Sequence, residues 1–192
     1  MDFSTITIFN IYKLMKKIIL ILLILSSPIF AKEKLTGILG GKLGDNIIEV
    51  IGAENYKSFE VTYDPRFKKD YQQFEYITSD KDLVQIFSER KTKKIVYIAT
   101  IFIIKNKQEC IKRRDKDITD VQKEFILPPK KGQEVGTFGL TNKDVMVFGD
   151  EEMIVNFSCI TIPNADPEAK DQYRFEILTR KFNTFLFSTE KK

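Results

Sequence analysis

The sequence predicts an α+β fold: a largely antiparallel sheet with one main helix, at about residues 106–125, and a short N-terminal helix. Three observations carry this prediction. A meander of short apolar segments leads to one long apolar stretch, that stretch runs straight into a capped helical segment, and a second group of strand-like segments follows. Strands in succession with few helices are typical of an α+β domain.

The long apolar stretch, residues 95–104, is expected to form a strand in the interior of the sheet. Its sequence, IVYIATIFII, is dominated by β-branched and aromatic residues, and Thr100 is its only clearly polar side chain. Such residues favour a pleated surface over a helix. The stretch has no strict alternation of apolar and polar residues, so we expect both of its faces to be covered.

The main helix is predicted to begin after Asn106, because an asparagine side chain can accept a hydrogen bond from the first turn, and Glu109 follows at the capping-box spacing. Pro128-Pro129 is expected to end it. Arg114 and Asp115 interrupt the apolar face, so we expect the middle turn to be wet. The apolar positions of the helix are Ile111, Ile118, Val121 and Phe125, a helical spacing.

The remaining elements are read from shorter patterns. A short helix is expected from Ile47 to Ile51, ended by Gly52. Phe182 to Phe187 is expected to extend the last strand or to begin another. The predicted strands, in addition to residues 95–104, are a first strand within 32–44 and the segments 58–63, 73–78, 83–87, 135–140, 145–148, 153–162 and 173–178.

The first 31 residues resemble a leader followed by a secretory signal. Lys16-Lys17 precedes the aliphatic run 18–25, and the pattern predicts cleavage between Ala31 and Lys32, with Met15 as a possible true start. The apolar run 18–31 is shorter than the roughly 20 residues that a spanning helix needs. We therefore expect residues 32–192 to form a single exported α+β domain without a stable membrane span, periplasmic or secreted.

Composition excludes several classes of function. The chain of 192 residues carries 31 basic and 27 acidic side chains, and removing residues 1–31 leaves a net charge of only +2, which argues against a nucleic-acid partner. The sequence contains no histidine, which removes Ser-His-Asp catalysis and the commonest zinc and copper ligand. With two cysteines it cannot build a Cys₄ or Cys₂His₂ zinc site. We predict no cofactor and no metal.

The two cysteines, Cys110 and Cys159, are predicted to form a disulfide, because an even pair in an exported protein favours a covalent bridge over free thiols. The bridge would join the first turn of the main helix to a late strand. A crosslink over this separation stabilises a fold by about 4 kcal/mol in the chain-entropy model.

No complete catalytic set is visible. The leading hypothesis is therefore a non-enzymatic exported protein that binds a protein or another component of the cell envelope. One alternative is a small hydrolase that uses Ser88 with Lys91, or a pair of carboxylates. The carboxylates considered are Asp64, Asp70, Glu75 and Glu89. A further alternative is a membrane-tethered protein with an uncleaved leader.

Overall fold

The computed structural model of the protein describes residues 32–61, 67, 69–79, 82–138, 141–163 and 170–189. The predicted leader and signal sequence, up to and including Ala31, lies outside the described residues, as does Asp64. Residues Glu33–Lys192 group into one compact unit. The fold described below is that of this unit alone.

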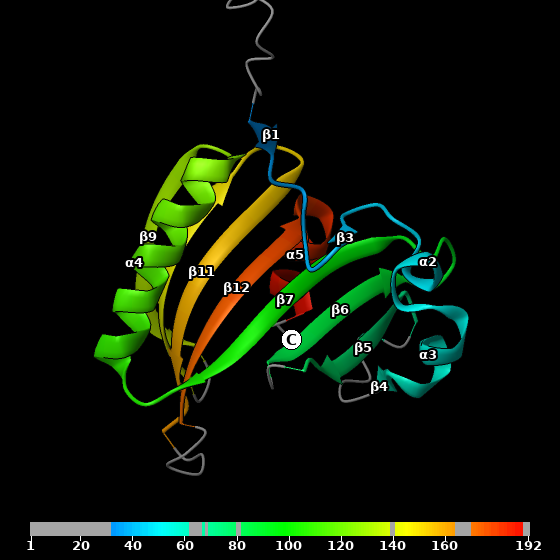
Figure 1. Ribbon diagram of the computed structural model, residues 1–192, viewed down its shortest axis with the longest axis horizontal. Helices are drawn as coiled ribbons and strands as arrows, with labels where there is room; N and C mark the ends of the chain where they lie inside the picture. The colour runs from blue at the N-terminus through cyan, green and yellow to red at the C-terminus, as the bar shows by residue number, and fades with distance from the viewer. Residues whose placement is uncertain are drawn as a thin grey trace, which may run out of the picture. The chain divides into compact units, whose positions relative to one another are not determined.

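The unit is built on one antiparallel sheet of eight strands with helices on both of its faces (Figure 1). The sheet order is β4-β5-β6-β7-β12-β11-β10-β9. This arrangement confirms the predicted α+β class, and it confirms residues 95–104 as an interior strand, between β6 and β12. The strands of the sheet are β4 (Glu60–Val61), β5 (Tyr71–Ile77), β6 (Leu83–Glu89), β7 (Ile95–Ile104), β9 (Lys130–Phe138), β10 (Thr141–Gly149), β11 (Met153–Thr161) and β12 (Asp171–Thr179).

Four helices and two small strand pairs complete the described residues. The helices are α2 (Ile47–Ile51), α3 (Ala53–Ser58), α4 (Lys107–Glu124) and α5 (Arg180–Thr189), and the small pairs join β1 (Glu33–Lys34) to β8 (Phe125–Ile126) and β2 (Gly37–Ile38) to β3 (Gly41–Lys42). Within these ranges no helix combines the length and the apolar character needed to cross a membrane.

Alternation along the strands separates two hydrophobic layers. In β12, Ile177 belongs to the layer beneath α4, whereas its neighbour Leu178 belongs to the layer that packs against Phe182 of α5. Successive side chains of a strand point to opposite faces, so α4 and α5 cover opposite sides of the sheet. In Figure 1, α4 lies in front of the sheet on its β11 side, and α5 lies behind the sheet near β12 and β7. A further hydrophobic cluster packs α2 against β5, β6 and β7.

Helix α4 begins where the sequence predicts. Of the two residues expected to make its middle turn wet, Asp115 is exposed and Arg114 is buried. The Asn106 side chain accepts a hydrogen bond from the Glu109 amide at 2.9 Å. Arg114, expected in solvent, is only 4% exposed and binds the Asp144 carboxylate of β10 at 2.6 Å. Gln133 donates to the same carboxylate at 2.6 Å. The charge is buried because strand β10, distant in sequence, supplies a buried counterion, and the Arg114 Nε also donates to the neighbouring Asp115 carboxylate at 3.0 Å.

Two predictions about helices and strands need correction, and one helix was not predicted. Helix α4 ends at Glu124, ahead of the proline pair, because the chain becomes extended at Phe125 and enters β8. Residues 182–187 are helical, in α5, and not a strand. Thr179 caps this helix, since its hydroxyl accepts a hydrogen bond from the Phe182 amide at 3.2 Å. The sequence reasoning also missed α3, whose helix-forming residues follow Gly52 directly.

A segment of three short strands, residues 33–46, crosses the sheet and is called here the β1–β3 segment. It is attached to β8 through the Leu35 amide, which donates to Ile126 at 3.1 Å, and to the start of β7, where Gly44 donates to Ile95 at 2.8 Å. Glycine is required at position 37 because the backbones of β2 and β3 approach closely there, and an added Cβ would collide with the Gly41 carbonyl. The segment therefore has a fixed course over the sheet.

Candidate functional site

The antiparallel order brings one end of several strands together. Glu89 at the end of β6, Ile95 at the start of β7, Thr179 at the end of β12 and Met153 at the start of β11 lie along the same end of the sheet. The β1–β3 segment passes over this end, attached to β7 by the bonds given above. The cavity between the segment and the strand ends, together with a second cavity that shares lining residues with it, forms the candidate site.

The cavity beneath the segment, called here the sheet-end pocket, has a volume of about 440 Å³. This lies within the roughly 300–1,000 Å³ of sites that enclose small molecules. Most of its accessible wall is apolar. Three lysines and two glutamates are also among its lining residues. The lining residues are Lys34, Thr36, Leu43, Gly44, Glu89, Lys94, Ile95, Val96, Glu152, Met153, Thr179 and Lys181.

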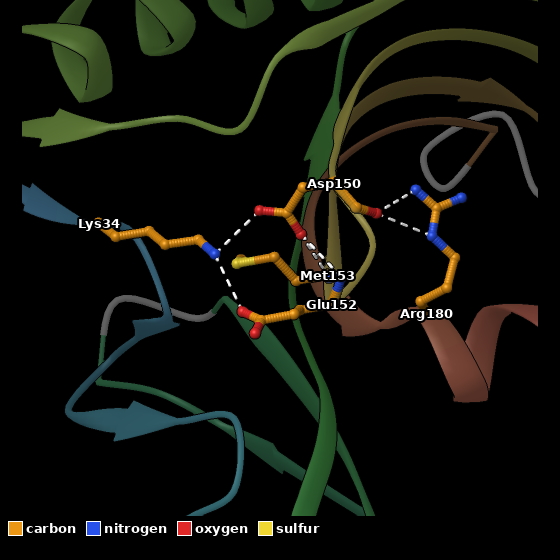
Figure 2. Close-up of polar contacts among 5 residues, drawn as sticks. All are labelled: Lys34, Asp150, Glu152, Met153 and Arg180. Carbon is orange, nitrogen blue, oxygen red and sulfur yellow. Dashed lines mark hydrogen bonds and ion pairs between the residues drawn. The ribbon is translucent and has the colours of Figure 1, made fainter.

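A cluster around the β10–β11 turn connects the β1–β3 segment to the sheet (Figure 2). The Lys34 ammonium lies 2.9 Å from Asp150 and 3.2 Å from Glu152. Asp150 also accepts hydrogen bonds from the amides of Glu152 and Met153, each at 2.9 Å. The Lys34 hydrogen bond, with help from the Met153 and Glu152 amides, lowers the pKa of Asp150 to about 2. The same pairing raises the pKa of Lys34.

Arg180, the first residue of α5, supports the cluster from the other side. Its backbone amide donates to the Glu152 carbonyl at 2.8 Å, and its Nε donates to the Asp150 carbonyl at 2.9 Å. A terminal nitrogen of the same guanidinium donates to this carbonyl as well. The turn is thereby held between Lys34 and Arg180, as Figure 2 shows. It forms one side of the sheet-end pocket through Glu152 and Met153.

A second cavity, of about 550 Å³, adjoins the first and shares Glu89 and Lys181 with it. The Lys181 ammonium lies 2.8 Å from Glu89, and the Thr92 hydroxyl donates to the same carboxylate at 2.7 Å. The Lys181 hydrogen bond, followed by that of Thr92, lowers the pKa of Glu89. Asp70 also lines this cavity, so two of the four carboxylates considered from the sequence reach one hollow.

The predicted disulfide pair lies elsewhere, inside the layer between α4 and the sheet. The sulfur atoms of Cys110 and Cys159 are 2.11 Å apart, a disulfide distance, and both residues are buried. The pair joins the first turn of α4 to β11. Neither cysteine lines the cavities described above. The bridge therefore belongs to the scaffold.

The geometry gives little support to the hydrolase alternative. Ser88 is fully buried, and its hydroxyl has no hydrogen-bond partner, whereas Lys91 is exposed in the turn that follows β6. Glu75 lies outside the cavity that Asp70 and Glu89 share, and it accepts hydrogen bonds from Gln73 and Gln85. In the described ranges, no three acidic or sulfur ligands gather as they would around a metal ion.

The chain was compared with protein-family models, with curated proteins and with solved structures, and none of the three comparisons found a match. Sequence reasoning did not single out Lys34, Lys94 or Met153, because strands from distant parts of the chain bring them together. The sequence feature that could have pointed to this site is the pair of charged turns, 89–94 and 150–152, which lie next to predicted strands.

Proposed function

We propose that this protein is exported, periplasmic or secreted, and that it acts by binding a protein or another component of the cell envelope through the sheet-end pocket, without catalysing a reaction. The observation that carries the proposal is the pocket itself: about 440 Å³, with a mainly apolar wall and charged groups at its border. Concave sites of this kind bind ligands by burying apolar surface, and a few polar groups fix the orientation.

Export is supported by the cysteine pair. Disulfides persist in oxidising compartments and are rare in the cytosol. Cys110 and Cys159 lie at disulfide distance across 49 residues of sequence, with both sulfur atoms inside the fold. The signal-like pattern of residues 16–31 points to the same compartment. Both features are typical of an exported domain.

Binding is favoured over catalysis by the state of the carboxylates near the pocket. A general acid or base works best with a pKa near the operating pH. Glu89 and Asp150 have the opposite tendency, because Lys181 and Lys34 respectively lower the pKa of each carboxyl. Both are ionised at neutral pH, and both are already engaged in hydrogen bonds. They are suited to shaping a binding site.

The compartment is tested first, by mass spectrometry of the protein recovered from the periplasm or the medium. We expect a mature N-terminus at Lys32. Recovery of the protein only from the cytosol, with its leader intact, would contradict export.

Binding is tested with immobilised protein spanning residues 32–192 and with envelope extracts separated into protein and lipid fractions. We expect saturable binding from one fraction, and its loss in Thr36→Trp, where the indole fills the pocket from the β1–β3 segment. The matched control is Thr119→Trp, on the exposed side of α4. Binding that is absent, or that is equally strong in both variants, would contradict the proposed site.

A further inference from the structure

The wall of the sheet-end pocket indicates an apolar ligand body. Its apolar lining residues include Leu43, Ile95, Val96 and Met153. All of these except Leu43 are nearly or fully buried in the fold. Its only side-chain hydroxyls are those of Thr36 and Thr179, and the second already accepts the hydrogen bond that caps α5. Transferring a polar group into such a space without a partner is costly.

Among the residues that the structure describes, two of the three lysines that line the pocket form ion pairs, and the third does not. Lys34 binds Asp150 and Glu152, and Lys181 binds Glu89, so the acidic groups here are already engaged with cations. Lys94 is different: it is exposed, and within the described residues its ammonium has no ion pair and no hydrogen bond. It lies close enough to Glu89 to lower the pKa of that carboxyl, after the larger effects of Lys181 and Thr92. One cation is thus left at the border to meet an anion.

We propose that the pocket takes a free monoanionic amphiphile, a linear alkyl chain ended by a carboxylate, with the chain against Leu43, Val96 and Met153 and the carboxylate on Lys94. The proposal rests on the proposed function and names the chemical class of its ligand. A cationic head group would be repelled by Lys94, whereas Lys34 and Lys181 are already paired with acidic groups, and a neutral head group would leave Lys94 without a partner.

An alkyl chain fits this wall better than a peptide does. A peptide carries an N–H and a C=O at nearly every residue, and each needs a hydrogen-bond partner once it is buried. The two threonine hydroxyls of the wall cannot supply these partners. An alkyl chain has no such groups, and it is stabilised in proportion to the apolar area that it buries.

The test is isothermal titration calorimetry of the protein spanning residues 32–192 with three probes of equal chain length, each below its micellar concentration: dodecanoate, dodecyltrimethylammonium and dodecyl maltoside. We expect dodecanoate to bind about tenfold more tightly than the cationic probe, the discrimination that one hydrogen-bonded charge supplies. Equal affinity for the three probes, or no binding of dodecanoate, would overturn the proposal.

Two variants locate the head group and the chain. Lys94→Glu should remove the preference for dodecanoate, whereas Lys112→Glu, an exposed lysine on α4, should leave it unchanged. Thr36→Trp should abolish binding of all three probes, because the indole occupies the space of the chain. A preference that survives Lys94→Glu contradicts the assigned position of the carboxylate.

A fourth arm separates a free amphiphile from a membrane surface. Phosphatidylglycerol vesicles present an anion but keep their chains in the bilayer, so we expect them not to bind. Vesicle binding that depends on Lys94, without binding of dodecanoate, overturns the proposal. If an envelope fraction binds in a manner sensitive to Thr36→Trp while dodecanoate does not, the proposed function stands and the ligand class is wrong.

Discussion

Asp150 is the residue through which the β1–β3 segment is attached to the β10–β11 turn. Its pKa of about 2 lies below the ordinary value of 3.8, mainly because of the Lys34 hydrogen bond. Between these two values the unfolded chain binds more protons than the folded protein does. The contribution of Asp150 to stability is therefore complete above about pH 4, and it is lost as the pH falls toward 2.

We predict that Asp150→Asn lowers the free energy of unfolding at pH 7 by roughly 1 kcal/mol or less, since Lys34 is 39% exposed and solvent screens the pair. The variant should also lose less stability than the wild type between pH 4 and pH 2. Urea unfolding at pH 7, 4 and 2.5 measures both effects. Lys34→Met should reproduce them, and additive losses in the double variant would contradict the pairing.

At the scale of single elements, the helices mark the limit of what the sequence could predict. Helix α4 was predictable because Asn106 and a long apolar stripe are local signals. Helix α5 was misread because its aromatic residues suggested a strand, although Phe182, Phe185 and Leu186 have helical spacing and all pack into one layer. The expected exposure of Arg114 in α4 was a different error: its buried counterion, Asp144, comes from another strand, which no local pattern reveals.

The Arg114–Asp144 pair gives a prediction at this scale, because both side chains are less than a tenth exposed. Asp144→Ala should destabilise the protein by about 3 kcal/mol, since it leaves a buried guanidinium with the exposed Asp115 carboxylate as its remaining ion-pair partner. The double variant Arg114→Met with Asp144→Leu should recover most of this loss, because no buried charge remains. Chemical denaturation measures both. A double variant as unstable as Asp144→Ala would show that shape, and not charge, decides the stability of this contact.

At the scale of the whole molecule, the sequence predicted the list of strands better than their arrangement. Strands β4 to β7 lie side by side in chain order. Beyond β7, the strands of the second half follow in reverse chain order, from β12 to β9. The join between the halves is β7 with β12, whose partners Ile98 and Ile177 are far apart in sequence. The sheet-end pocket depends on this join, so it could not be predicted from local patterns. The cysteine pair was predictable, because only one pairing of two cysteines exists.

The disulfide acts across this join of distant parts, since it ties α4, which follows the first group of strands, to β11 of the second group. Closing a separation of 49 residues restricts the unfolded chain, and the expected stabilisation is about 4 kcal/mol. We predict that Cys110→Ser and the reduced wild type both lose stability of this order, measured by guanidinium unfolding with and without reductant. The variant should no longer respond to the reductant. Two titratable thiols in the unreduced, denatured protein would contradict the bridge. The binding tests belong on the oxidised protein, because neither cysteine lines the pocket and reduction should act on it only through the stability of the fold.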